Sequence, residues 1–174
     1  EGAGTDAALA FGSALHILLE HLPQVAPTER PCVARRLLAD TDPDIAVEAE
    51  ATALRLLTKP DLQAVFGPDS LAEVDIVATP AAFGGARLTG SIDRLLIAPD
   101  RVLAVDFKSN RVVPDRPENT PDGILRQLAA YAAALADLYP DRRIDTAILW
   151  TQTAHLMPIP HEIVRNALQD TAIS

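Results

Sequence analysis

Two acids and a lysine lie close together in the middle of the chain. Asp93 ends the stretch Gly90-Ser91-Ile92-Asp93, and Asp106 and Lys108 follow thirteen residues later in Asp106-Phe107-Lys108. Carboxylate oxygens are ligands that Mg²⁺ prefers in proteins, and a lysine beside them can orient a water and stabilise developing negative charge. If they lie on neighbouring strands, these three side chains predict the centre of a metal-dependent phosphodiesterase.

Lys108 also stands out against the composition of the chain. The sequence has thirteen arginines but only two lysines, Lys59 and Lys108. Arginine is bulky and always charged, whereas lysine is a compact charge whose pKa responds to burial, so we expect chemistry at Lys108. A second interpretation stays open, because charged residues often end strands and Asp106 and Lys108 can form an ordinary ion pair there.

The strand that carries this pair is predicted over residues 102–108. Its alternation places Val102, Ala104, Asp106 and Lys108 on one face and Leu103, Val105 and Phe107 on the other. Both faces are apolar until Asp106. Because an isolated buried charge is costly, the acid and the lysine must pair with each other or bind a ligand.

The remaining elements follow from periodicity and turn signals. Helices are expected over 6–22 with Thr5 or Asp6 as cap, over 27–38, and over 42–57, with a short turn or helix near 61–66. Strands are expected over 71–78, over 86–97 after a Phe83-Gly84-Gly85 turn, and over 102–108. The tight connections between these three strands predict an antiparallel meander.

A proline-rich loop over 112–121 leads into a helix expected over 122–138, with Thr120 as N-cap and Pro121 at the first helical position. A strand over 144–151, a second over 156–159 that can pair with it, and a terminal helix over 160–169 follow. The order of elements predicts an α/β (α+β) fold, a mixed central sheet of about four to five strands flanked by helices, with an N-terminal helical part.

His16 lies on the apolar stripe of the first helix, and Gly12, one turn earlier, would let a strand or a metal ion approach closely. As a metal ligand, His16 would add an imidazole nitrogen to the two carboxylates. The competing interpretation is a core histidine bonded to the backbone, which is the more frequent situation for a single histidine on an apolar face. Glu20, one turn beyond His16, could equally orient its ring.

Gln127 and Tyr131 stand four residues apart and therefore share one face of their helix. Tyr131 also continues an apolar stripe, so it can serve as a packing residue with a polar tip. Glu73, in the first strand, is a candidate supporting acid.

Length and composition set limits on these interpretations. With 174 residues, 48% of them hydrophobic, the chain is expected to form one domain over 1–174. Cys32 is the only cysteine, which excludes an internal disulfide and favours a cytosolic compartment. The sequence shows neither a signal-peptide h-region nor an apolar run near 18 residues, so we expect a soluble piece without a membrane role. The net charge of -9 argues against a broad basic DNA-binding surface, so another element would have to deliver a DNA substrate.

Four motifs in order carry a family resemblance: Gly12-x-x-x-His16, Gly90-x-x-Asp93, Asp106-x-Lys108 and Gln127-x-x-x-Tyr131. Together they resemble the RecB-family branch of the PD-(D/E)XK nucleases. The surrounding residues look like the C-terminal nuclease domain of an AddA-type helicase-nuclease subunit, and the resemblance covers nearly the whole chain. One departure is Val105, which stands before Asp106 where the family pattern has proline.

The resemblance implies a restriction-endonuclease-like nuclease core over 67–174 behind the helical part over 1–66. By the same resemblance, a Mg²⁺ ion, for which Mn²⁺ can substitute, would be held by His16, Asp93, Asp106 and the Phe107 carbonyl. Lys108 would be the catalytic lysine, with Gln127 and Tyr131 supporting the site and the DNA strand.

The resemblance further implies a place in recombinational repair of double-strand breaks. Single strands would be fed by a helicase motor, which alone would use ATP, and the full-length protein would form a heterodimer with a second nuclease-bearing subunit in the bacterial cytoplasm. The chain begins with Glu1 rather than Met, and we expect it to be a fragment of such a protein. A nuclease-like module that binds DNA or a partner without cutting remains the alternative, and a free-standing exonuclease is disfavoured.

Overall fold

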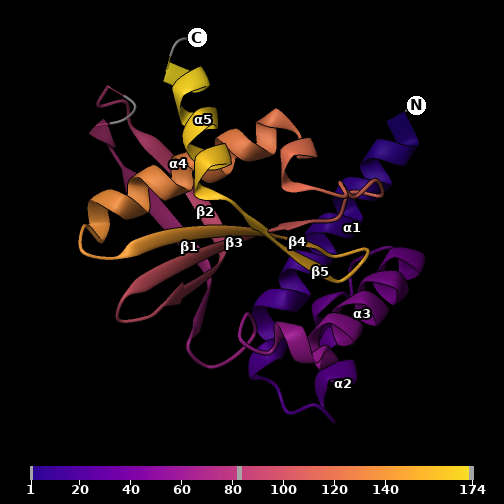
Figure 1. The fold of residues 1–174 in the computed structure, drawn as a ribbon. Helices are drawn as coiled ribbons and strands as arrows, with labels where there is room; N and C mark the ends of the chain where they lie inside the picture. Colours follow the sequence, from indigo (N-terminus) through magenta and orange to yellow (C-terminus); the bar gives the residue numbers. More distant parts are fainter. Residues whose placement is uncertain (1, 82–83, 173–174) are drawn as a thin grey trace.

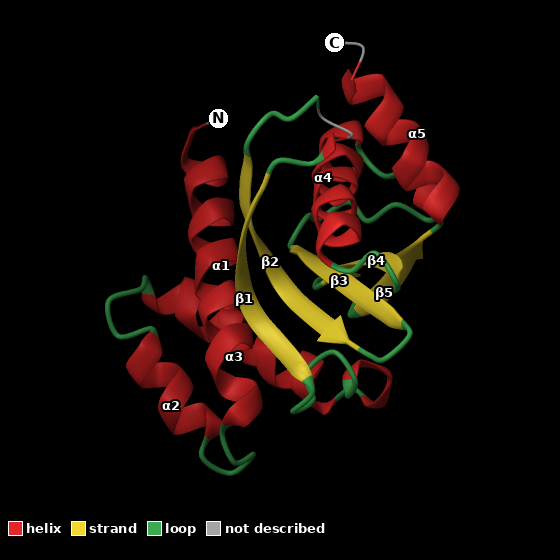
Figure 2. Cartoon of the chain, turned by 90° about the vertical axis from the view of Figure 1, so that its left-hand side faces the viewer, coloured by secondary structure: helices red, strands yellow, loops and turns green. Residues whose placement is uncertain are grey.

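The computed structural model describes residues 2–81 and 84–172. Five strands form one mixed sheet in the order β1-β2-β3-β4-β5, and helices cover both of its faces (Figures 1 and 2). The predicted α/β class and the mixed, helix-flanked sheet are therefore confirmed. In this part of the chain, no helix combines the length and hydropathy that crossing a membrane requires.

The first three strands form the predicted antiparallel meander: β1 (Ser70–Ala78), β2 (Leu88–Ile97) and β3 (Arg101–Lys108). β4 (Arg143–Trp150) then pairs parallel to β3, and β5 (His155–Ile159) pairs antiparallel to β4. A parallel pair needs a crossover connection rather than a hairpin. The helix between β3 and β4 supplies it.

Three helices lie on one face of the sheet: α1 (Gly2–His21), α2 (Arg30–Leu37) and α3 (Pro43–Thr58). The crossover helix α4 (Asp122–Leu138) and the terminal helix α5 (His161–Ala172) lie on the other (Figure 2). Single 3₁₀ turns occupy Leu22–Gln24, Pro60–Leu62 and Pro117–Asn119, and the second of these is the short element expected near 61–66.

The sheet separates two apolar cores, and β3 contributes to both. Val105 and Phe107 pack in the core with α1, α2 and α3, while Val102 and Ala104 pack with α4. This is the predicted alternation. Trp150, the last residue of β4, is fully buried in the α4 core and is paired in register with Lys108.

One of the predicted helix caps is observed and another is not. Asp42 caps α3, since its Oδ1 accepts the N–H groups of Asp44 at 3.0 Å and Ile45 at 3.3 Å. The predicted Thr120 cap of α4 is wrong. Pro121 occupies the N-cap position, and the Thr120 hydroxyl is buried without a hydrogen-bond partner among the described residues.

Two other boundaries also differ. α1 begins at Gly2, so the predicted caps Thr5 and Asp6 both lie inside the helix. α2 begins at Arg30 rather than at residue 27. In the predicted turn before β2, Gly84 and Gly85 have φ values of 61° and 79°, which favour glycine, while Phe83 lies outside the described residues.

Candidate active site

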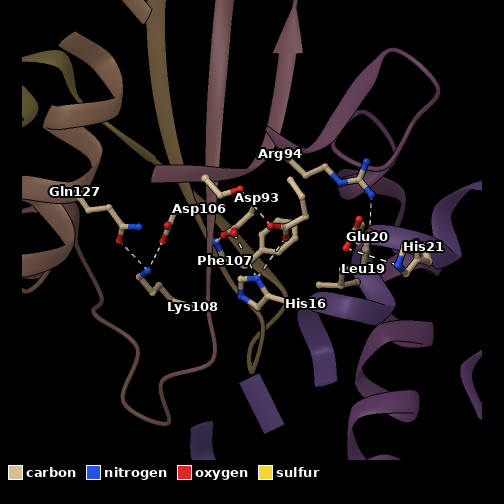
Figure 3. Close-up of polar contacts among 12 residues, drawn as sticks. His16, Leu19, Glu20, His21, Asp93, Arg94, Asp106, Phe107, Lys108 and Gln127 are labelled. Atoms are coloured by element: carbon tan, nitrogen blue, oxygen red, sulfur yellow. Dashed lines mark hydrogen bonds and ion pairs between the residues drawn. The ribbon is translucent and has the colours of Figure 1, made fainter. Parts of the chain in front are cut away.

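The residues singled out for chemistry converge from five elements, α1, β1, β2, β3 and α4. Figure 3 shows Asp93 from β2 between His16 from α1 and the Asp106-Lys108 pair from β3, with Gln127 of α4 reaching Lys108 from the opposite side. Their polar atoms form two groups. We call His16, Glu73 and Asp93 the ligand cluster, and Asp106, Lys108, Gln127 and Tyr131 the lysine network.

The ligand cluster joins one imidazole and two carboxylates. His16 Nδ1 lies 3.3 Å from Asp93 Oδ1 and 3.7 Å from Glu73 Oε1. One ligand atom from each residue lies within 4.8 Å of the other two. His16 is therefore not a core histidine bonded to the backbone. Glu20 does not orient it either, because its carboxylate lies 3.7 Å from His21.

The second oxygen of Asp93 ties the cluster to β3. Asp93 Oδ2 accepts the backbone N–H of Phe107. Because a strand residue directs its N–H and its C=O to the same side of the strand, the Phe107 carbonyl points to the β2 side of β3. That orientation suits the carbonyl ligand that the sequence resemblance implies.

The backbone is irregular where the two acids meet. The β1–β2 pairing includes Ala72 opposite Arg94 and Val74 opposite Ile92, but not the intervening Glu73 and Asp93. Glu73 has a φ of 46°, a left-handed conformation that is uncommon for a residue with a side chain and costs about 1–3 kcal/mol.

Side-chain alternation along β2 is interrupted at the same place. Ile92 packs in the core with α4, whereas Arg94, two residues on, bonds to α1 on the opposite face of the sheet. A regular strand would place both on one face. The irregularity allows Asp93 and Glu73 to meet His16 together.

The lysine network is bonded internally. Lys108 Nζ lies 2.7 Å from Asp106 Oδ2 and donates to Gln127 Oε1 at 3.1 Å. The Gln127 amide donates to the Tyr131 hydroxyl at 2.8 Å, and that hydroxyl donates to the Ser91 carbonyl at 2.7 Å. Gln127 and Tyr131 thus share a helix face, and Tyr131 combines core packing with a polar contact.

One glycine makes room for these contacts, and a second lies beside the loop after β3. A Cβ at Gly90 would lie 3.1 Å from Tyr131 Cε1, closer than side chains normally pack, so glycine allows the tyrosine to lie against β2. At Gly12 a Cβ would lie 3.4 Å from Ser109 Oγ. The group that approaches Gly12 is therefore the loop after β3.

Burial and charge shift the ionisation of both groups. Burial raises the pKa of Asp106 to about 6, against the opposing effect of Lys108. The hydrogen bond to Asp93 raises the pKa of His16, and burial raises the pKa of Glu73. Each of these residues therefore holds a proton to a higher pH than in water, so protons compete with a cation for these groups as the pH falls.

The donor set fits a divalent cation. Imidazole nitrogen with carboxylate and carbonyl oxygen suits Mn²⁺, and the oxygen atoms suit Mg²⁺. His16 and Asp93 lie together, and Glu73, expected only as a supporting acid, joins them. The Phe107 N–H bonds to Asp93, and the Phe107 carbonyl as a ligand stays a prediction. The Asp106 carboxylate lies against Lys108, so its role as a ligand stays a prediction.

Two further residues contribute to the site. Ser91 donates its hydroxyl to Glu73 Oε2 at 3.3 Å and accepts from Tyr131 through its carbonyl, so it connects the two groups. Arg94 is buried beside Asp93. The sequence signal for Arg94 was available, since it is a second charge, next to Asp93, between the apolar residues Ile92 and Leu95.

Comparisons with known proteins place this arrangement in a family. A search of the solved structures finds one titled "Crystal structure of SSO0001", with a TM-score of 0.39 and 15% identity, covering 91% of this chain and 73% of that chain. The comparison with curated proteins finds no match. The family model described as the PD-(D/E)XK nuclease superfamily matches residues 1–172, which include every residue of both groups. The chain therefore belongs to the PD-(D/E)XK nuclease superfamily.

Proposed function

We propose that the chain is a Mg²⁺- or Mn²⁺-dependent deoxyribonuclease that hydrolyses phosphodiester bonds of single DNA strands. Membership of the nuclease superfamily supports hydrolysis of DNA. The observation that carries the metal dependence is the convergence of His16, Glu73 and Asp93 ligand atoms within 4.8 Å, next to the buried Asp106-Lys108 pair.

The contacts of each side chain support a particular role in the proposed reaction. His16, Asp93, Asp106 and the Phe107 carbonyl would hold the cation, with Glu73 at the same cluster. A bound divalent cation would polarise a phosphate oxygen and acidify a water at this position.

Lys108 would orient the attacking water and stabilise charge developing on the phosphate. Its ammonium group is already held in place by Asp106 and by Gln127, whose own amide is fixed by Tyr131. A group held in this way needs little reorganisation when charge develops.

We further propose that this nuclease is the C-terminal domain of an AddA-type helicase-nuclease that acts in recombinational repair of double-strand breaks in the bacterial cytoplasm. The four motifs support this, since they occur in order from Gly12 to Tyr131. The charge of -9 also supports it, because a chain with so little basic character suits a motor that delivers the strand. A heterodimer with a second nuclease-bearing subunit belongs to the same proposal.

The test is cleavage of an end-labelled single-stranded oligonucleotide in Mg²⁺ or Mn²⁺. Lys108→Met removes the ammonium group and keeps the aliphatic stem, and we expect it to abolish the products. Lys59→Met is the matched control, because Lys59 is the other lysine and its Nζ bonds to the Ala154 carbonyl outside the site. Equal cleavage by the two variants would contradict the proposed role of Lys108.

The same assay separates the alternative function. DNA binding without metal-dependent products, in the wild type as well as in both variants, would favour a nuclease-like module that binds without cutting. Processive degradation of long duplexes by the chain alone would instead contradict the proposed dependence on a motor.

A further inference from the structure

Arg94 is a buried cation that forms no ion pair with any described carboxylate. It is 2% exposed, and its two terminal nitrogens donate to the Leu19 carbonyl and to Ser70 Oγ (Figure 3 shows the bond to Leu19). Its Nε has no hydrogen-bond partner among the described residues. Glu73 and Glu20 favour its charge only through space, without a bond to it. Burying a charge without a bonded counter-charge is costly, so Arg94 needs a role that an apolar residue could not fill.

The Leu19 carbonyl is a group that needs such a donor. In a continuing helix it would accept the N–H of the residue four positions later, but that residue is Pro23, which has none. α1 ends at His21, so the carbonyl lies at the negative end of the helix dipole. The guanidinium of Arg94 supplies the missing hydrogen bond and a positive charge.

A second contact path leads from Arg94 to the ligand cluster. Its guanidinium carbon lies 5.5 Å from the centre of the Phe66 ring, and Phe66 and Phe107 are 5.9 Å apart between ring centres. The Phe107 ring in turn meets the His16 ring edge-on at 5.7 Å. Arg94 therefore contacts the C-terminal turn of the helix that carries His16 and also the aromatic rings packed behind His16.

We propose that Arg94 is a positioning residue that holds α1 against β2 so that His16 and Asp93 bind the same cation. The inference rests on the proposed function. His16 lies one turn before Leu19, and Asp93 directly precedes Arg94. The Arg94 side chain thus links the end of α1 to the strand that carries Asp93. It lies close to both proposed ligands and would not itself bind the cation.

The experiment compares Arg94→Met with Arg94→Lys and with Arg55→Met as the matched control. Arg55 also binds two backbone carbonyls, those of Thr151 and Gln152, but it links α3 to the turn after β4. Mn²⁺ affinity is measured by titration calorimetry, and hydrogen exchange is measured at the backbone amides in the last turn of α1, with every variant kept below its unfolding temperature.

We expect Arg94→Met to weaken Mn²⁺ binding about 10- to 100-fold, the range seen when groups that orient metal ligands are lost, and to accelerate exchange at the end of α1. Arg94→Lys should be intermediate, because a single ammonium group cannot replace two directed donors. Arg55→Met should lower stability and leave both readings unchanged.

The possible failures can be told apart. Unchanged Mn²⁺ affinity and unchanged exchange in Arg94→Met would overturn the role of Arg94. If that variant does not fold, wild-type values for both readings in Arg94→Lys would overturn it equally. A wild-type chain that binds no Mn²⁺ would refute the proposed function, while the exchange measurement would still report whether Arg94 anchors α1.

Discussion

The ligand cluster on α1, β1 and β2 and the lysine network on β3 and α4 are neighbours, yet they are built differently. Carboxylate oxygens in the ligand cluster face one another across β1 and β2, and the His16 and Glu73 side chains are 36% and 31% exposed. In the lysine network, the side chains pair or bond with one another from Asp106 through Lys108 and Gln127 to Tyr131, and Asp106 is 2% exposed. The difference matches the proposed roles, in which a cation would complete the ligand cluster while folding alone assembles the lysine network.

The largest expected effect tests whether the lysine network acts in chemistry at all. Asp106→Asn keeps the shape of the side chain and removes its charge, and we expect it to reduce cleavage of a labelled single strand by about 10³-fold or more, comparable to the loss of a major electrostatic contact in an active site. Asp145→Asn is the control, since Asp145 also pairs with a basic residue two positions away, Arg143, at an exposed position. Equal activity of the two variants would rule out Asp106 as an active-site acid.

The next effect separates the ligand cluster from the lysine network. Asp93→Asn and Glu73→Gln should each weaken Mn²⁺ binding, by about 10- to 100-fold if both are ligands or direct supports of a ligand. Gln127→Ala, in the lysine network, should leave Mn²⁺ binding near the wild-type value. Calorimetric titration measures all three. An unchanged Mn²⁺ affinity in Glu73→Gln would show that Glu73 neither binds the cation nor supports a ligand.

A pH series sharpens the comparison further. Because burial raises the folded-state pKa of Asp106 to about 6, and the bond to Asp93 raises the pKa of His16, both groups take up protons as the pH falls. Protons then compete with the cation, so Mn²⁺ affinity should rise with pH through about 6 and level off above the pKa of His16. The slope should approach tenfold per pH unit for each proton displaced. Equal affinity at pH 5 and pH 8 would contradict this expectation.

The smallest effect concerns the support of Lys108. Tyr131→Phe removes the hydroxyl that bonds Gln127 and the Ser91 carbonyl, and we expect it to lower the free energy of unfolding by about 1 kcal/mol, the usual contribution of a single hydrogen bond. Chemical denaturation measures the change. Tyr139→Phe is the control, since it keeps the ring beside the Arg142 guanidinium. A loss in the Tyr131 variant no larger than in this control would show that packing alone fixes Tyr131.

Local signals predicted much of the fold. Asp42-Pro43 marks the start of α3, and α4 has the predicted bounds of Asp122–Leu138, because caps, prolines and periodicity act within a few residues. The Thr120 cap failed for a related reason. Threonine is a good cap in general, but here Pro121 occupies the N-cap position. A sequence pattern does not locate a helix boundary to within one residue.

Non-local features could not be predicted in the same way. The left-handed backbone at Glu73, and the break in alternation that it shares with Asp93, depend on three elements meeting. From the sequence, Arg94 is only a charged residue in a strand. Its contacts with Leu19 and Phe66 show that it connects β2 to the end of α1. Strand periodicity describes one strand at a time. The site lies where β1 and β2 deviate from regular strand alternation.

The placement of Trp150 gives the molecule an optical reporter of its own. It is the only tryptophan of the chain, it is fully buried, and it is paired in register with Lys108 across β3 and β4. Its emission therefore comes from a single place, one strand away from the proposed catalytic lysine. Loosening of the sheet at that end would expose the indole to water and shift its spectrum to the red, without any label having been attached to the protein.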